Sequence, residues 1–110
     1  MGHTEPSEKF ISAQASAAEA PLFVLSFRHR DELASAVSLA GWQAIAARRA
    51  DNAEQRFLAS SAMIAVVDAR GAFDDGLAAV RSLADAVEIN ASSLLVLVSR
   101  TDVDRLDELF

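Results

Sequence analysis

Four short, mainly apolar runs constrain the fold of this chain more than any other feature. The clearest is Ala62–Val67, which is continuously apolar and stops at Asp68. Runs of this length are typical of strands buried on both faces of a parallel sheet. The other three predicted strands are Leu22–Leu25, Trp42–Ala46 and Leu94–Val98.

Segments with helical spacing alternate with these runs. The pattern predicts four helices: one from about Arg28 to Gly41, one capped by Asp51-Asn52, one from Gly76 to Glu88, and one capped by Thr101 or Asp102. The loop Ala69–Asp75 is expected before the third helix. Alternating strands and helices favour right-handed crossovers, and so predict an α/β fold with a parallel sheet of about four strands and helices on both faces.

The chain divides into two parts by composition. Residues 1–20 are rich in Ala, Ser and Glu and carry few large apolar side chains, so we expect a flexible leader. Residues 21–110 carry all four runs and are expected to form one domain. The total of 110 residues suits a single domain.

Charge and residue content exclude several function classes. The net charge is −6, and no basic stripe typical of nucleic-acid binding proteins stands out, so this domain is not expected to bind nucleic acid. Cysteine is absent, so a metal site would need carboxylates and would suit a hard ion such as Mg²⁺. No apolar run approaches the ~20 residues that cross a bilayer, and no secretion signal is apparent. We therefore expect a cytoplasmic protein without a membrane role.

Candidate functional residues follow from the predicted sheet. Parallel sheets bind their ligands beyond the carboxyl ends of the strands. The residues at these ends are Ser26-Phe27 on the first strand, Asp68 on the third and Ser99 on the fourth. A carboxylate and a hydroxyl at neighbouring strand ends could act on one bound anion, although either residue alone is also common in turns.

These motifs resemble the receiver domain of bacterial two-component response regulators. The apolar strand, Asp68 and the following loop, which closes with Asp75-Gly76, resemble the phosphoacceptor region of that family. Leu94–Ser99 resembles the strand that ends in the family's switch Ser or Thr. The resemblance implies a flavodoxin-like fold, with Asp68 as phosphoacceptor and Ser99 as the residue that contacts the phosphoryl group.

The resemblance also shows where this chain departs from the family. Receivers hold Mg²⁺ with two acidic residues after the first strand, but Ser26 and Phe27 stand there. Asp68 is then the only plausible ligand among the family positions, so no cofactor is expected unless the domain is phosphorylated with Mg²⁺. The fifth strand, which carries a lysine, and the fifth helix are also missing before Phe110. The resemblance is therefore to a degenerate and C-terminally incomplete receiver.

Three arginines offer a different partner for Asp68. Arg28, Arg30 and Arg70 are all expected near the strand ends, and one of them could form a permanent ion pair with Asp68. Such a pair would make the domain independent of phosphorylation. Ordinary surface charge is the alternative for these arginines, and a solvated helix-entry residue is the interpretation for His29.

Three function hypotheses remain open from the sequence. The first is a non-enzymatic pseudo-receiver, an N-terminal regulatory or interaction domain of a longer protein such as a cyclic-di-GMP (GGDEF/EAL) enzyme. Its expected partners are a histidine kinase or an output domain. A homodimer is also possible, in which a second copy covers the apolar side chains of the last helix and the exposed edge beside Leu94–Val98. The second is an active phosphoacceptor that uses Asp68, and the third is a small α/β ligand-binding module.

Overall fold

A parallel sheet of four strands lies at the centre of the structure. The computed structural model describes residues 20–109, so the predicted leader, apart from Ala20, lies outside the described residues. The strands are β1 (Pro21–Ser26), β2 (Gln43–Ala47), β3 (Ile64–Asp68) and β4 (Ser93–Leu97). Their order in the sheet is β2-β1-β3-β4, and all neighbouring pairs are parallel. The inner strands β1 and β3 therefore end side by side.

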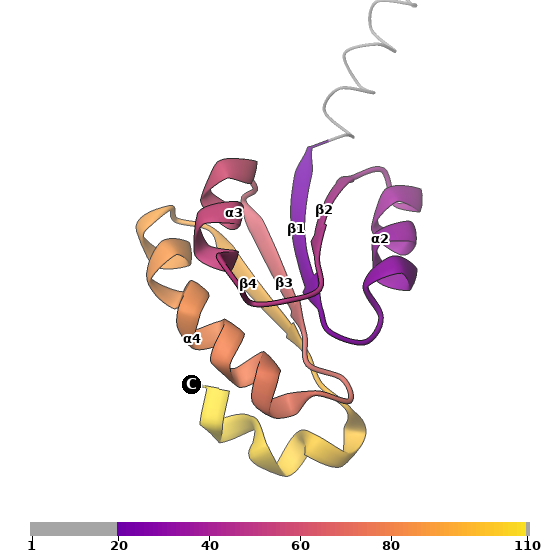
Figure 1. The fold of residues 1–110 in the computed structure, drawn as a ribbon, viewed down its shortest axis with the longest axis vertical. Coiled ribbons are helices and arrows are strands. Elements are labelled where there is room, and N and C mark those ends of the chain that lie inside the picture. The colour runs from indigo at the N-terminus through magenta and orange to yellow at the C-terminus, as the bar shows by residue number, and fades with distance from the viewer. Residues whose placement is uncertain (1–19, 110) are drawn as a thin grey trace, which may run out of the picture.

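Helices cover both faces of this sheet (Figure 1). Helix α2 (Arg30–Leu39) lies on one side, while α3 (Ala53–Ser60) and α4 (Phe73–Ile89) lie on the other. The chain then forms a 3-10 helix, η1 (Arg100–Leu109), that packs beside α4. This arrangement confirms the predicted α/β fold and is consistent with a flavodoxin-like topology. No helix within residues 20–109 has the length and apolarity needed to span a bilayer.

The side chains of β1 alternate between two hydrophobic clusters, as the period of two in a strand requires. Phe23 and Leu25 are fully buried in the larger cluster, under α3 and α4. There the ring of Phe23 meets that of Phe57 edge-to-face, with centroids 5.8 Å apart. Leu22 and Val24 belong to a smaller cluster on the α2 side. The first strand is thus held from both faces, which fixes the position of its carboxyl end.

The α2 face of the sheet is less completely covered than the opposite face. No residue of α2 is fully buried, although Leu33 and Val37 pack against the smaller cluster. On the edge strand β4, Leu95 remains 54% exposed. An apolar part of the sheet beside β4 is therefore accessible to solvent.

Helix α4 begins earlier than the sequence pattern predicted. It starts at Phe73 rather than Gly76, so the loop after β3 spans only residues 69–72. Phe73 is buried in the larger cluster, and the N–H of Gly76 already donates to the carbonyl of Ala72 at 2.9 Å. Burial of the phenyl ring holds the first turn of α4 against the core. In the sequence, the charged residues Asp74 and Asp75 had suggested a loop at this position.

Two predicted helix caps are wrong. Asn52 precedes α3, but it lies in the left-handed region (φ 55°) and its side chain makes no capping hydrogen bond. Capping side chains normally require an extended backbone, so Asn52 cannot act in the expected way. The last helix begins at Arg100, before Thr101 and Asp102. It follows the tighter 3-10 pattern, because the N–H of Asp102 donates to the carbonyl of Ser99.

Candidate functional site

The site lies where the inner strands β1 and β3 end. Ser26 and Asp68 are the last residues of these strands, rather than residues beyond them, and they are paired in the sheet register. Paired residues of parallel strands project to the same face, so their side chains lie next to each other. The hydroxyl of Ser26 donates to Oδ2 of Asp68 at 2.8 Å, and both side chains are buried. Ser26 is thus a direct partner of the candidate phosphoacceptor.

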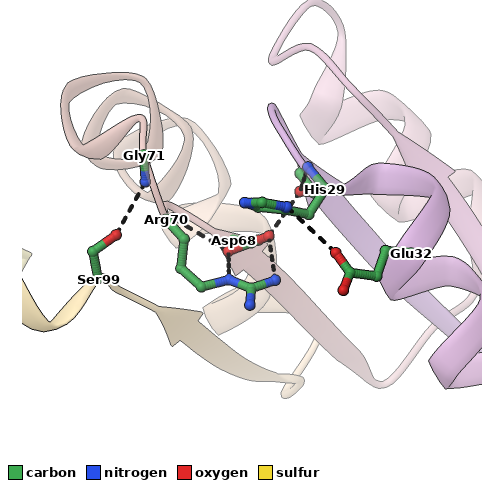
Figure 2. A network of polar contacts seen from close by, with 7 residues as sticks. His29, Glu32, Asp68, Arg70, Gly71 and Ser99 are labelled. Carbon is green, nitrogen blue, oxygen red and sulfur yellow. Dashed lines mark hydrogen bonds and ion pairs between the residues drawn. The ribbon is translucent and has the colours of Figure 1, made fainter.

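Arg70 forms an ion pair with Asp68 through the edge of its guanidinium that carries Nε and Nη2 (Figure 2). Nε of Arg70 donates to Oδ1 at 2.7 Å, and its NH2 group donates to Oδ2 at 3.0 Å. The backbone N–H of Arg70 adds a third bond, to Oδ1 at 3.2 Å. Of the three arginines considered from the sequence, Arg70 is therefore the one that pairs with Asp68.

The hydrogen bonds to Asp68 use the full capacity of its carboxylate. Oδ1 accepts from the backbone and Nε of Arg70, and Oδ2 accepts from Ser26 and the NH2 group of Arg70. An ionised carboxylate offers about four lone-pair positions. In this arrangement no lone pair of Asp68 remains free for another ligand or for attack on a phosphoryl group.

The same contacts keep Asp68 ionised. Burial by itself raises the pKa of this carboxyl group, because a charge is less stable away from water. The hydrogen bonds from Arg70 and Ser26 outweigh burial and hold the pKa of Asp68 below its ordinary value. In turn, the hydrogen bond to Asp68 raises the pKa of Arg70. Both partners are therefore charged at neutral pH.

Ser99, the residue predicted to contact a phosphoryl group, bonds to the loop after β3 in this structure. Its hydroxyl oxygen accepts a hydrogen bond from the N–H of Gly71 at 3.1 Å (Figure 2). Gly71 has a φ of 74°, which favours glycine, and it follows directly after Arg70. This hydrogen bond connects the loop that carries Arg70 to the segment between β4 and η1, where Ser99 lies.

His29 and Glu32 form a second polar contact across the site from Arg70 (Figure 2). Nδ1 of His29 lies 3.4 Å from Oε1 of Glu32. The backbone N–H of His29 donates to the hydroxyl oxygen of Ser26. The charge of Glu32 also contributes to raising the pKa of Arg70. Sequence reasoning missed Glu32 as a site residue, because its position four residues beyond Arg28 placed it within a helix. Only the fold shows that this helix begins beside the strand ends.

The remaining candidates form no hydrogen bond or ion pair with Asp68. Phe27 packs against the larger hydrophobic cluster, on the opposite face of the sheet from Ser26. Arg30 pairs with the neighbouring carboxylate of Asp31, with 2.6 Å between its NH2 group and Oδ1. Arg28 lies over Gly71: a Cβ added to that glycine would be 3.7 Å from Cγ of Arg28.

The residues at this site do not fit a Mg²⁺ ion. Asp68 already accepts four hydrogen bonds, and an arginine guanidinium occupies the side on which a cation would approach. Phe27, at a position where the family carries a ligand, has no oxygen to offer. In the part of the chain that the structure describes, no group of three or more metal-ligating side chains comes together elsewhere.

Comparisons with protein-family models, with curated proteins and with solved structures gave no match for this chain. The fold is therefore established by its own strand order and helix arrangement. The likeness to receiver domains depends on the motifs around Asp68 and Ser99 within that fold.

Proposed function

We propose that this chain is a receiver-like signalling module of the pseudo-receiver kind, which acts through protein contacts and not through phosphorylation. One observation carries the proposal: the carboxylate of Asp68 accepts four hydrogen bonds, two of them from the guanidinium of Arg70. Arg70 places a positive charge where a phosphorylated receiver would hold its cation. Asp68 thereby stays ionised and paired with Arg70, so the charge at this site does not change.

Phosphorylation would require this arrangement to open. An aspartate accepts a phosphoryl group by in-line attack with a free carboxylate lone pair. In this chain the Arg70 guanidinium must first leave, and a buried carboxylate would lose two charge-assisted hydrogen bonds. The absence of an acidic pair at Ser26-Phe27 adds a second obstacle, since no neighbouring carboxylates would hold Mg²⁺ for the transfer.

The proposal includes the setting in which such a module would work. It would be a cytoplasmic, non-enzymatic, N-terminal regulatory domain that passes a signal to a histidine kinase or to an output domain, such as a cyclic-di-GMP (GGDEF/EAL) enzyme. The analogy with composite signalling proteins supports this setting. A homodimer is part of the same proposal, and the exposed Leu95 on the edge strand β4 supports it.

An active phosphoacceptor is the second candidate, and one observation favours it. Asp68 lies at the end of β3 in an ionised form, which is the form that attacks phosphorus. This candidate requires Arg70 to swing away when a phosphodonor and Mg²⁺ bind. It then predicts that Asp68 can be labelled.

Intact-mass measurement after incubation with acetyl phosphate and Mg²⁺ distinguishes the two candidates. We expect no phosphate on the wild-type protein and none on Asp68→Asn. Addition of one phosphate to the wild type, and its loss in Asp68→Asn, would establish the active phosphoacceptor instead. Beryllofluoride with Mg²⁺ gives an independent readout, since an active site would change the NMR signals of Asp68 and Ser99.

A further inference from the structure

Charged residues are distributed unequally between the two ends of the sheet. The loops that lead into β2, β3 and β4 (residues 40–42, 61–63 and 90–92) contain no charged residue. The loops that follow β1, β2 and β3 carry four arginines: Arg28, Arg48, Arg49 and Arg70. Asp51 is the single acidic residue in those three loops. The loops at this end of the sheet are therefore basic, and it is the end at which parallel sheets bind ligands.

A hollow of about 330 Å³ opens at this basic end, between the loop after β1 and the loop after β2. Its walls include Phe27, Arg28 and His29 from the first loop and Arg48 from the second. The first turn of α2, beginning at Arg30, closes another side. The volume falls within the lower range of sites that hold small molecules.

Several donors around this hollow have no acceptor within residues 20–109. Among residues 20–109, no carboxylate forms an ion pair with Arg28 or Arg48. The first backbone hydrogen bond of α2 runs from Leu33 to His29, and no side chain caps this helix. The N–H groups of residues 30–32 therefore lack intrahelical acceptors.

Two acidic residues, Asp31 and Glu32, also line the hollow. Asp31 is paired with Arg30, and Glu32 lies 3.4 Å from His29. The lining thus carries three arginines against two carboxylates, and the guanidinium groups of Arg28 and Arg48 come from two different loops. This arrangement favours an anion with several oxygens, because each guanidinium can bind two of them.

We propose that this hollow binds a small molecule through a phosphate or pyrophosphate group. Arg28 and Arg48 would bind the phosphate oxygens, the N–H groups at the start of α2 would add further donors, and Phe27 would border the organic part of the ligand. Neither Asp68 nor Arg70 lines the hollow, although His29 and Glu32 belong both to its lining and to the surroundings of that pair, and the proposal involves no transfer of the phosphate. The inference therefore goes beyond the proposed function and does not depend on it.

Titration of the ¹⁵N-labelled full chain with sodium pyrophosphate, at constant ionic strength, tests this site. We expect amide shifts confined to residues 27–32 and 48–49. Arg28→Gln/Arg48→Gln should weaken binding about tenfold or more, because two charge-assisted contacts are lost. Arg81→Gln/Arg100→Gln removes the same charge at exposed positions outside the hollow, and it should leave the affinity within about twofold.

Several outcomes would overturn the proposal. One is the lack of any amide shift with millimolar pyrophosphate or inorganic phosphate. Another is an equal loss of pyrophosphate affinity in the two double variants, which would show that overall charge alone controls binding. Citrate binding as tightly as pyrophosphate would remove the assignment to phosphate. Tighter binding of a short single-stranded RNA, with shifts well beyond the hollow, would identify a nucleic-acid surface instead. The NMR spectrum of each variant verifies that it is folded.

Discussion

The guanidinium of Arg70 and the carboxylate of Asp68 form a two-pronged ion pair between residues only two positions apart, with Nε–Oδ1 and NH2–Oδ2 distances of 2.7 and 3.0 Å. The carboxylate side chain is 1% exposed, whereas that of the arginine is 38% exposed. Asp68 thus depends on Arg70 for its charge balance inside the protein, while Arg70 can still reach water. This asymmetry determines the outcomes expected for variants of the pair.

Replacement of Arg70 should destabilise the fold. Arg70→Gln leaves the buried Asp68 without its counter-charge, and we expect the free energy of unfolding to fall by about 2 kcal/mol. This loss in the free energy of unfolding is smaller than for a fully buried ion pair, because water can partly replace the exposed guanidinium. Urea denaturation measures it, with Arg81→Gln on the exposed face of α4 as the control, expected to change stability by less than about 0.5 kcal/mol. Equal stability of the two variants would contradict a stabilising pair.

The pair should also make stability sensitive to acid. The pKa of Asp68 is lowered in the folded protein, so the unfolded chain, with a pKa of about 3.9, binds this proton more tightly. Its contribution is complete above about pH 5 and is lost as the pH falls through the lowered, folded value. Denaturation at several pH values should show the stability difference between wild type and Asp68→Asn shrinking below about pH 4. A difference that stays constant down to about pH 2 would show that ionisation of Asp68 is not responsible.

Gly76 should resist replacement although it lies within a helix. A Cβ at this position would overlap the side chain of Ala69, because α4 packs closely against the residue that follows β3. Gly76→Ala should therefore lower stability by about 1–3 kcal/mol, although alanine is the better helix former. Ser82→Ala, at an exposed position of the same helix, is the matched control and should be neutral or slightly stabilising. Thermal denaturation of both variants checks this, and a stabilised Gly76→Ala would refute the close approach.

Restoring the acidic character of the site should restore cation binding. In Ser26→Asp/Arg70→Ala the guanidinium is removed and a second carboxylate is added next to Asp68, since the hydroxyl of Ser26 lies 2.8 Å from Oδ2 of Asp68. Two neighbouring carboxylates provide hard oxygen ligands. NMR titration should then show Mg²⁺ binding in the millimolar range near position 68. The wild type and Arg70→Ala alone serve as comparisons and should bind markedly more weakly. Equal Mg²⁺ binding by all three proteins would show that the composition of this site does not control it.

Much of the fold could be predicted from the sequence because its strands are short, apolar and sharply ended. The run Ala62–Val67 predicted β3, and the predicted end at Val67 differs by one residue from the observed end at Asp68. The start of α4 was harder to predict, since Asp74 and Asp75 suggested a loop while burial of Phe73 determined the helix. The 3-10 form of η1 depends on a tertiary position and has no strong local signal.

The site was only partly predictable for a related reason. Arg70 could be put forward with Arg28 and Arg30, but the choice among them depends on loop geometry, which Ser99 helps to fix through Gly71. Ser26 was expected at the end of the first strand and as a replacement for a missing acid, but not as a partner of Asp68. Its hydrogen bond to Asp68 follows from the register of β1 and β3, and strand pairing cannot be read from one strand alone.

The closeness of Asp68 and Arg70 along the chain has a consequence for how such a module can change over generations. Both halves of the pair belong to β3 and the loop directly after it, so no other element has to adapt when the pair is gained or lost. One amino-acid replacement at position 70 is enough to add or remove it, and its stability effect is small enough for a folded intermediate to survive. A single mutational step could therefore have formed this ion pair, and a single step could remove it.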